Sequence, residues 1–246
     1  MKQIFLLMLM SFSMNVWGYW ALHSERPWLF VYDSNLIKNS FYMLKKIMDP
    51  LNGKIHFAVK SNDNLGVIKY INSLGAGTDV VSIGELKRCL KVSVKPKDII
   101  FSGVGKQKDE IEFAINKNIK QLNAESIEEL KDIIEISKNI KKKVNVALRV
   151  NLDINAKTHK KISTGDENSK FGIIYDDIVH AYKLINDASF INPYGLAIHV
   201  GSQLFDYDVF FHTFSKIKNL AVELKNLGYE VNHLDLGGGF GVDYTM

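Results

Sequence analysis

Strand-like and helix-like segments alternate along most of this sequence, and this alternation restricts the possible folds more than any other feature. The predicted strands are Ile55–Lys60, Thr78–Ser82, Ile99–Ser102, Lys120–Asn123, Val144–Asn151, Gly195–Gly201 and His233–Leu236. The predicted helices between most of them are Asn64–Leu74, Ile83–Leu90, Lys106–Asn116, Ser126–Asn139, Tyr175–Asn186 and Val209–Leu227. Repeated strand–helix units predict a parallel sheet, either doubly wound or closed into most of a barrel.

The two faces of each predicted strand differ in polarity. In Val144–Asn151, Val and Leu residues alternate with Asn145, Ala147, Arg149 and Asn151. A parallel strand covered by helices on both faces would be apolar almost throughout. A barrel instead needs one apolar face toward its helices, and it carries reactive side chains at the C-terminal ends of its strands. The alternation therefore favours an α/β barrel over a sheet with one wet face.

Composition and charge exclude several classes of function. The chain is 46% hydrophobic and 24% charged, with a net charge of +4, which is typical of a globular protein. Basic residues are scattered, and the densest run, Lys141–Lys143, is interpreted as a solvated helix end, so no nucleic-acid partner is expected. With Cys89 as the single cysteine, no intrachain disulfide or cysteine-based metal cluster can form, and no metal is predicted.

The N-terminal segment does not match the rest of the chain. One lysine, Lys2, precedes an apolar stretch from Ile4 to Met14, as in a secretory signal peptide. The stretch is short for a transmembrane helix, and no small-x-small cleavage pattern follows it. We therefore interpret residues 1–25 as an atypical, signal-like or misannotated start and residues 26–246 as one barrel domain of a cytoplasmic enzyme with no membrane association.

Three sites at predicted strand ends carry reactive side chains. Lys60 ends an apolar strand on its polar face, where a partly buried amine could form an imine with an aldehyde cofactor. The glycines Gly237, Gly238 and Gly239 follow another strand and could let a phosphate approach the backbone amides. His199 could lie flat against a cofactor ring, and Ser202 could bind phosphate. Each site alone has an ordinary structural explanation, but all three occur at strand C-termini.

These stretches resemble the ornithine/diaminopimelate/arginine decarboxylase group, and within it the diaminopimelate decarboxylases. The resemblance runs from about Trp28 to Tyr244 in collinear order. The matching stretches include Phe57–Asn62, Gly77–Leu86, Ile100–Lys106, Leu148–Asn151, Lys157–Gly165, Ser169–Ile173, His199–Leu204 and Asp235–Gly239. It implies a barrel of the alanine-racemase type that binds pyridoxal 5′-phosphate and a homodimer that decarboxylates an amino acid.

The resemblance also implies a role for individual residues. Lys60 and His199 would be catalytic, with Lys60 forming the imine to the cofactor and His199 packing on its ring. The other implied cofactor-binding residues are Asp79, Arg149, Ser202, Gly237, Gly238 and Gly239. His159, Ser163 and Thr164 would belong to a mobile loop beside the substrate, and this loop favours diaminopimelate over ornithine.

Several features that the resemblance leads us to expect are missing from this chain. The eighth barrel strand with its Glu-Pro-Gly-Arg-like motif, the C-terminal β domain, the substrate-binding arginine and tyrosine and the shared cysteine motif have no match here. We expect an incomplete barrel of about seven strands with two open edges, poorly folded and inactive alone. Two alternatives to lysine formation from diaminopimelate stay open: a related ornithine, arginine or carboxypolyamine decarboxylase, and a non-catalytic homologue that binds the cofactor.

Overall fold

The structure is a computed structural model that describes residues 5–10, 17–18, 30–152 and 171–243. Its main sheet contains the seven predicted strands, with ends that shift by a few residues. They are β4 (Lys54–Ala58), β5 (Gly77–Val80), β6 (Ile99–Phe101), β7 (Gln121–Ala124), β8 (Val144–Asn151), β10 (Ile191–Ala197) and β11 (His233–Asp235). All their pairings are parallel, so the prediction of a parallel barrel sheet is confirmed.

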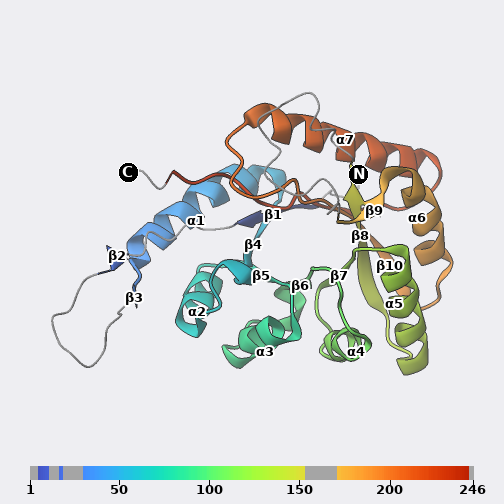
Figure 1. Ribbon diagram of the computed structural model, residues 1–246, viewed down its shortest axis with the longest axis horizontal. Coiled ribbons are helices and arrows are strands. Elements are labelled where there is room, and N and C mark those ends of the chain that lie inside the picture. The colour runs from blue at the N-terminus through green and yellow to red at the C-terminus, as the bar shows by residue number, and fades with distance from the viewer. Residues whose placement is uncertain (1–4, 11–16, 19–29, 153–170, 244–246) are drawn as a thin grey trace.

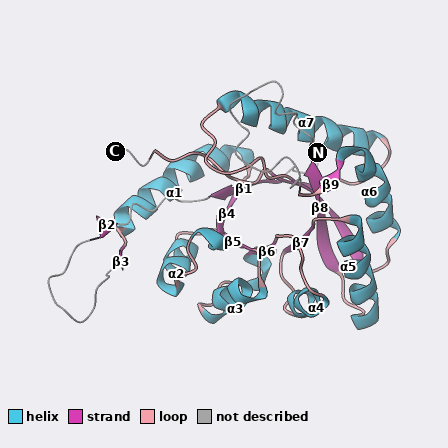
Figure 2. Cartoon of the chain, in the orientation of Figure 1, coloured by secondary structure: helices cyan, strands magenta, loops and turns pink. Residues whose placement is uncertain are grey.

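The helices surround the strands on the outside (Figure 1; Figure 2). They are α1 (Ser34–Met48), α2 (Leu65–Ser73), α3 (Ile83–Lys91), α4 (Lys108–Asn116), α5 (Ile127–Ile140), α6 (Ile178–Asp187) and α7 (Tyr207–Asn226). Side chains that follow a strand often start the next helix: Ser82 and Ser126 accept hydrogen bonds from backbone amides in the first turns of α3 and α5. The sequence analysis did not predict α1.

An N-terminal strand completes the sheet. Strand β1 (Phe5–Met10) lies between β11 and β4 and is parallel to both. Because β8 also pairs with β10, the pairings run around a closed ring. The two strand edges that we expected to be open are therefore paired among the described strands. Residues 5–10, part of the segment that we had interpreted as a signal-like or misannotated start, lie within the sheet.

Three short strands lie at the margins of this ring. Strand β9 (Ile173–Ile174) pairs in parallel with the last residues of β8. Strands β2 (Trp17–Gly18) and β3 (Phe30–Val31) form a small antiparallel pair of their own.

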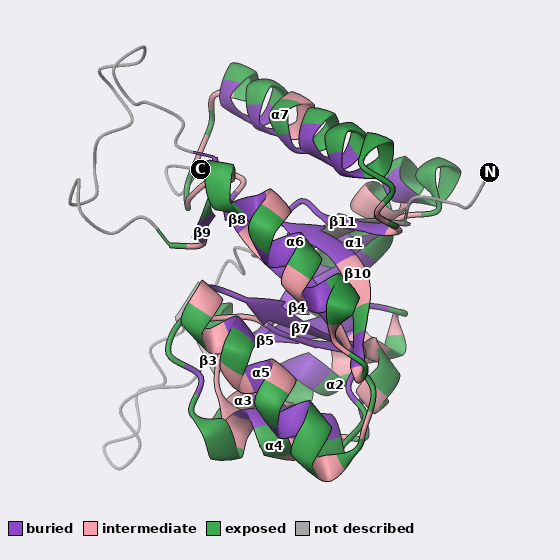
Figure 3. Cartoon of the chain, turned by 90° about the vertical axis from the view of Figure 1, so that its right-hand side faces the viewer, coloured by how far each residue is buried: buried purple, intermediate pink, exposed green. Residues whose placement is uncertain are grey.

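The apolar core lies between the strands and the helices. Ile55 and Phe57 of β4, and Val146 and Leu148 of β8, belong to one buried cluster with the inner faces of the helices, as the predicted alternation requires. Figure 3 shows the same arrangement: buried strands at the centre and helices whose exposed faces point outward.

The inside of the barrel is polar. The side chains on the opposite strand faces include His56, Asp79, Gln121, Asn123 and Asp235, each at most 3% exposed. A barrel interior is more often filled by branched apolar residues. We therefore relate these buried polar side chains to the site at the C-terminal ends of the barrel strands.

Within the described ranges, no helix combines the length and the apolar character needed to cross a lipid bilayer. Nor do any three His, Cys, Asp or Glu side chains of those ranges gather as metal ligands would.

Candidate active site

The side chains predicted to act together are brought to one end of the barrel. Lys60 lies in the short 3-10 helix Val59–Ser61 that follows β4, Asp79 lies in β5, and Arg149 lies near the end of β8. His199 follows β10, and Gly237 follows β11. Because these strands are parallel, their C-terminal ends open on the same side, which is where barrel enzymes carry their active sites.

Lys60 is exposed at this opening, whereas the sequence analysis had considered a partly buried amine. Its local backbone is fixed from both sides. The Ser61 hydroxyl donates to the carbonyl oxygen of Ala58 at 2.7 Å, and the Asn62 amide donates to the hydroxyl of Tyr32 at 3.1 Å. The positive charge of Lys60 acts on both Asp79 and His199, so the three side chains lie close enough to interact electrostatically.

His199 is held as a neutral imidazole. Burial first, and then the charges of Lys60 and Arg149, lower its pKa to about 4. Its ring lies against the glycine turn, because a Cβ atom built on Gly237 would be 3.3 Å from its Nδ1. An uncharged, flat ring between two cations and a glycine turn is suited to stacking on an aromatic ligand.

The turns that follow β10 and β11 interlock. The Leu204 amide donates to the Gly239 carbonyl at 2.9 Å, and the Gly241 amide donates to the Leu204 carbonyl at 2.8 Å. Gly239 has a φ of +95°, and a Cβ there would lie 1.7 Å from the carbonyl oxygen of Gly201. Only glycine fits this contact. Among the described hydrogen bonds the amides of Gly238 and Gly239 have no acceptor, which leaves two donors for an anion.

Arg149 is fixed by a buried carboxylate that the sequence analysis did not single out. Glu125 accepts a hydrogen bond from Nη1 of Arg149 at 2.6 Å, and its other oxygen accepts from the Gly103 amide at 2.9 Å. The guanidinium carbon also lies 5.7 Å from the centre of the Phe171 ring. The position of Arg149 is therefore set by β7, β6 and β8 together.

A second buried ion pair supports this carboxylate. Nζ of Lys106 lies 2.7 Å from Oε1 of Glu129, and the two side chains are 1% and 9% exposed. Lys106 also donates to the Gly103 carbonyl at 2.6 Å, while Glu129 accepts from the Glu125 amide at 3.3 Å. Lys106 thus fixes the backbone at Gly103, and Glu129 fixes the backbone at Glu125. The pair therefore holds both residues of the Glu125–Gly103 hydrogen bond in place.

Beneath the opening, hydrogen bonds connect two buried carboxyl groups. The Ser102 hydroxyl donates to Asp79 at 2.5 Å, and the Asn123 amide donates to Ser102 at 2.9 Å and to Asp235 at 3.1 Å. Asp235 also accepts from the Gly237 amide at 2.9 Å. Burial raises the pKa of Asp79 to about 8, with a further contribution from the charge of Asp235. Burial likewise raises the pKa of Asp235 to about 6.

The structure thus brings most of the predicted site residues together. Ser202 is exposed in the turn after β10. His159, Ser163 and Thr164 lie outside the described residues. The sequence analysis missed Glu125, Ser102 and Asn123. A usable signal was present for Asn123, because it is a polar residue on the inner face of a strand.

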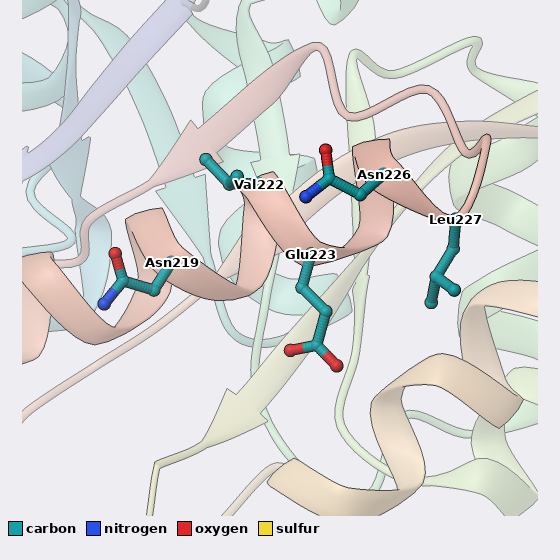
Figure 4. Close-up of a pocket in the computed structure, with 5 residues that line it drawn as sticks. All are labelled: Asn219, Val222, Glu223, Asn226 and Leu227. Carbon is teal, nitrogen blue, oxygen red and sulfur yellow. The ribbon is translucent and has the colours of Figure 1, made fainter.

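A pocket of about 390 Å³ lies elsewhere, on the outer surface of α7 (Figure 4). Its lining consists of Asn219, Val222, Glu223, Asn226 and Leu227. All five come from α7 and the residue that ends it, and none belongs to a strand end. Since it contains one carboxylate and no other charged group, we assign it no part in the site at the barrel opening.

Comparison with known proteins adds to this geometry. Residues 34–246 match the model of a family described as "Pyridoxal-dependent decarboxylase, pyridoxal binding domain". A protein named diaminopimelate decarboxylase from Helicobacter pylori strain J99 is 39% identical over 87% of this chain and 53% of its own length. One of the same name from Neisseria meningitidis serogroup A is 41% identical over 88% of this chain and 53% of its own length. The chain therefore spans about half the length of these relatives.

Solved structures have the same fold. The crystal structure of diaminopimelate decarboxylase from Helicobacter pylori complexed with L-lysine has a TM-score of 0.81, is 38% identical, and is matched over 87% of this chain and 54% of that one. The enzyme of the same name from M. jannaschii in complex with L-lysine has a TM-score of 0.82 at 35% identity, over 87% and 51%. A lysine/ornithine decarboxylase from Vibrio vulnificus has a TM-score of 0.71 at 21% identity, over 87% and 53%.

Proposed function

Because this chain belongs to the pyridoxal-dependent decarboxylases through their pyridoxal-binding domain, we propose that it binds pyridoxal 5′-phosphate at the barrel opening. We propose further that the full-length protein decarboxylates meso-diaminopimelate to L-lysine. The observation that carries the proposal is the meeting of Lys60, neutral His199 and the free glycine amides at one end of the barrel.

The residues at the opening fit this cofactor. It has an aldehyde, a flat aromatic ring and a phosphate, and each has a chemically matched group here. The exposed amine of Lys60 can bond to the aldehyde, and the His199 ring can lie on the aromatic face. The amides of Gly238 and Gly239, which have no described acceptor, can donate to the phosphate.

When bound, the cofactor supplies an electron sink for the negative charge that remains on the substrate carbon after carbon dioxide leaves. The protein's own residues would position the cofactor and hold it at the barrel opening. Arg149 is kept in place by Glu125 and supplies fixed positive charge beside the opening. His199 presents an uncharged ring, because its pKa of about 4 keeps it from adding a third cation beside Lys60 and Arg149. A proton must replace the lost carboxyl group, and we assign that step to no residue of this chain.

The choice of substrate rests on the pattern of similarity. Relatives named diaminopimelate decarboxylase are 36–41% identical to this chain. The arginine decarboxylase of a Chlorella virus is 22% identical, and the lysine/ornithine decarboxylase of Vibrio vulnificus is 21% identical. Identities this low support the fold alone. Diaminopimelate is therefore favoured over ornithine, arginine and carboxypolyamines as the substrate of the full-length protein.

Cofactor trapping tests the proposal. The purified chain is incubated with pyridoxal phosphate and reduced with borohydride, and the modified lysine is mapped by mass spectrometry. We expect one label per chain, at Lys60, and none in a Lys60→Arg variant. Lys54→Arg, at the start of the same strand, is the matched control and should label normally. Labels scattered over many lysines, unchanged by Lys60→Arg, would refute cofactor binding at this site.

A second experiment separates the alternatives. The full-length protein is assayed for carbon dioxide release from diaminopimelate, ornithine, arginine and carboxynorspermidine. Release from diaminopimelate alone supports the proposed substrate. Labelling at Lys60 without release from any of the four would instead favour the non-catalytic homologue.

We also propose that the full-length protein is a cytoplasmic homodimer. This rests on the resemblance to the decarboxylase group, whose members are expected to form dimers with shared sites. Light scattering of the full-length protein should give twice the mass of one chain, and a monomer that is active would contradict the dimer.

A further inference from the structure

The two buried carboxyl groups beneath the site have unequal surroundings. Asp235 accepts two N–H donors, the Gly237 amide at 2.9 Å and the Asn123 side chain at 3.1 Å. Asp79 accepts one donor, the Ser102 hydroxyl, at 2.5 Å. That hydroxyl is oriented by Asn123, which donates to its oxygen at 2.9 Å. Since N–H donors stabilise a carboxylate, the negative charge belongs on Asp235.

The charged groups around the pair agree with this assignment. The carboxylates of Asp235 and Glu85 and the cation Lys60 all act on Asp79. Asp235 is acted on by the cations Lys120 and Arg149. Burial raises the pKa of both carboxyl groups, to about 8 for Asp79 and to about 6 for Asp235. Asp235, which accepts the two N–H donors, therefore ionises at the lower pH.

We propose that Asn123 is a positioning residue that keeps the negative charge of this pair on Asp235 and the proton on Asp79. The consequence concerns Lys60 and rests on the proposed function. An ionised Asp79 would stabilise the ammonium form of Lys60, which cannot form an imine. A neutral Asp79 leaves the amine of Lys60 available to an aldehyde.

Asn123 itself is locked in the orientation that this role requires. The Gln121 side chain donates to Oδ1 of Asn123 at 2.5 Å. Both N–H bonds of the amide are thereby directed to Ser102 and Asp235. Asn123 of β7, Ser102 after β6 and Asp235 of β11 come from three different strands or strand ends, so the connection exists only in the folded barrel.

Infrared spectroscopy of the cofactor-free, 246-residue chain tests the inference directly. A protonated carboxyl group has a C=O band distinct from that of a carboxylate. At pH 7 we expect one buried carboxylic acid, whose band is removed by Asp79→Asn and retained in Asp235→Asn. In an Asn123→Leu background, Asp235 loses a donor, and Asp235→Asn should then remove the band instead. Asn145→Ala alters an inner-face amide whose partners among the described residues are the Lys120 carbonyl and Asn192, and it should leave the assignment unchanged.

Two results would overturn the inference: no buried carboxylic acid at pH 7, or an acid band that stays with Asp79 in the Asn123→Leu background. If Asn123→Leu does not fold, Asn123→Ser retains a polar group and gives the same comparison. Labelling of Lys60 gives a second readout. We expect Asn123→Leu to slow it about tenfold at pH 7. Failure of the parent chain to label would count against the proposed function, and the infrared result stands apart from it.

Discussion

Glu125 and Arg149 form a salt bridge of 2.6 Å whose carboxylate side chain is 3% exposed and whose guanidinium side chain is 15% exposed. The two residues lie on neighbouring strand ends, and the carboxylate is the only acidic partner that the described residues give to Arg149.

Glu125→Gln should therefore weaken cofactor binding. It leaves a largely buried cation beside the site with a weaker partner, and a hydrogen bond to a charged group contributes about 1.5–3 kcal/mol. We expect about a 10- to 100-fold higher dissociation constant for pyridoxal phosphate, measured by absorbance titration. Glu128→Gln, in the exposed first turn of α5, is the matched control. Equal affinity of both variants would show that the ion pair does not organise the site.

Lys106→Ala should destabilise the fold far more than Lys108→Ala. Lys106 and its partner are buried, and removing one member of such a pair costs about 3–5 kcal/mol. Lys108 is exposed and pairs with Asp132 and Glu135 in solvent, so its loss should change stability little. Urea unfolding of the two variants makes the comparison. Similar midpoints would mean that the buried pair adds nothing to stability.

Asp79 should make the protein less stable as the pH rises from about 4 to 8. Its pKa is raised to about 8 in the folded state, against 3.8 for the unfolded chain, so the folded state binds the extra proton between these values. The contribution to stability is complete below the unfolded value and is lost as the pH rises through about 8. We expect the unfolding free energy to fall between about pH 4 and 8 by at most about 1.4 kcal/mol per pH unit and to level off above that. Asp79→Asn should flatten this slope, and the exposed Asp109→Asn should not.

His233 should make the protein less stable as the pH falls into the acid range. Burial, with the charges of Lys120 and Lys54, lowers its pKa to about 3, and its ring nitrogens have no described hydrogen-bond partner. The unfolded chain therefore takes up a proton first as the pH falls below 6.5, and stability is lost from there downward. His233→Phe should keep the stacking on Tyr194, whose ring centre is 4.8 Å away. Between pH 6.5 and 4.5 it should lose less stability than the parent chain.

Gly239→Ala should disrupt the phosphate-facing turn. The added Cβ would lie 1.7 Å from the Gly201 carbonyl oxygen, so the two interlocked turns would have to separate. Gly228 offers a control, because its φ of +90° is similar but nothing lies within 4 Å of its Cβ position. Gly228→Ala should cost about 1–2 kcal/mol of backbone strain. Only Gly239→Ala should also abolish labelling of Lys60, and normal labelling there would argue against a phosphate site at this turn.

The sequence predicted the repeating part of the fold well. Strand β8 runs from Val144 to Asn151 as expected, because its alternation is long and its apolar face is needed by the helices. Strand β1, in the apolar segment before Met14, was not predicted. Its part in the sheet depends on β11 and β4, and a short apolar run looks the same in a strand and in a signal peptide.

Side-chain partnerships were the least predictable part of the site. Lys60, His199 and the glycines stand out because their residue types at strand ends are unusual. Glu125 and Asn123 do not, since each acquires its role from a partner on another strand. Such pairings follow from strand register, which a single sequence does not contain.

The position of β1 has a consequence for how the chain reaches its native state. Leu7 pairs with Lys54, 54 − 7 = 47 positions away, and with Asp235, 235 − 7 = 228 positions away. Contacts between residues so distant in sequence slow folding, because a long loop must be closed before they form. Strand β1 thus acquires β11 as its second neighbour late in folding, and until then one side of the sheet has to be kept from pairing with other chains.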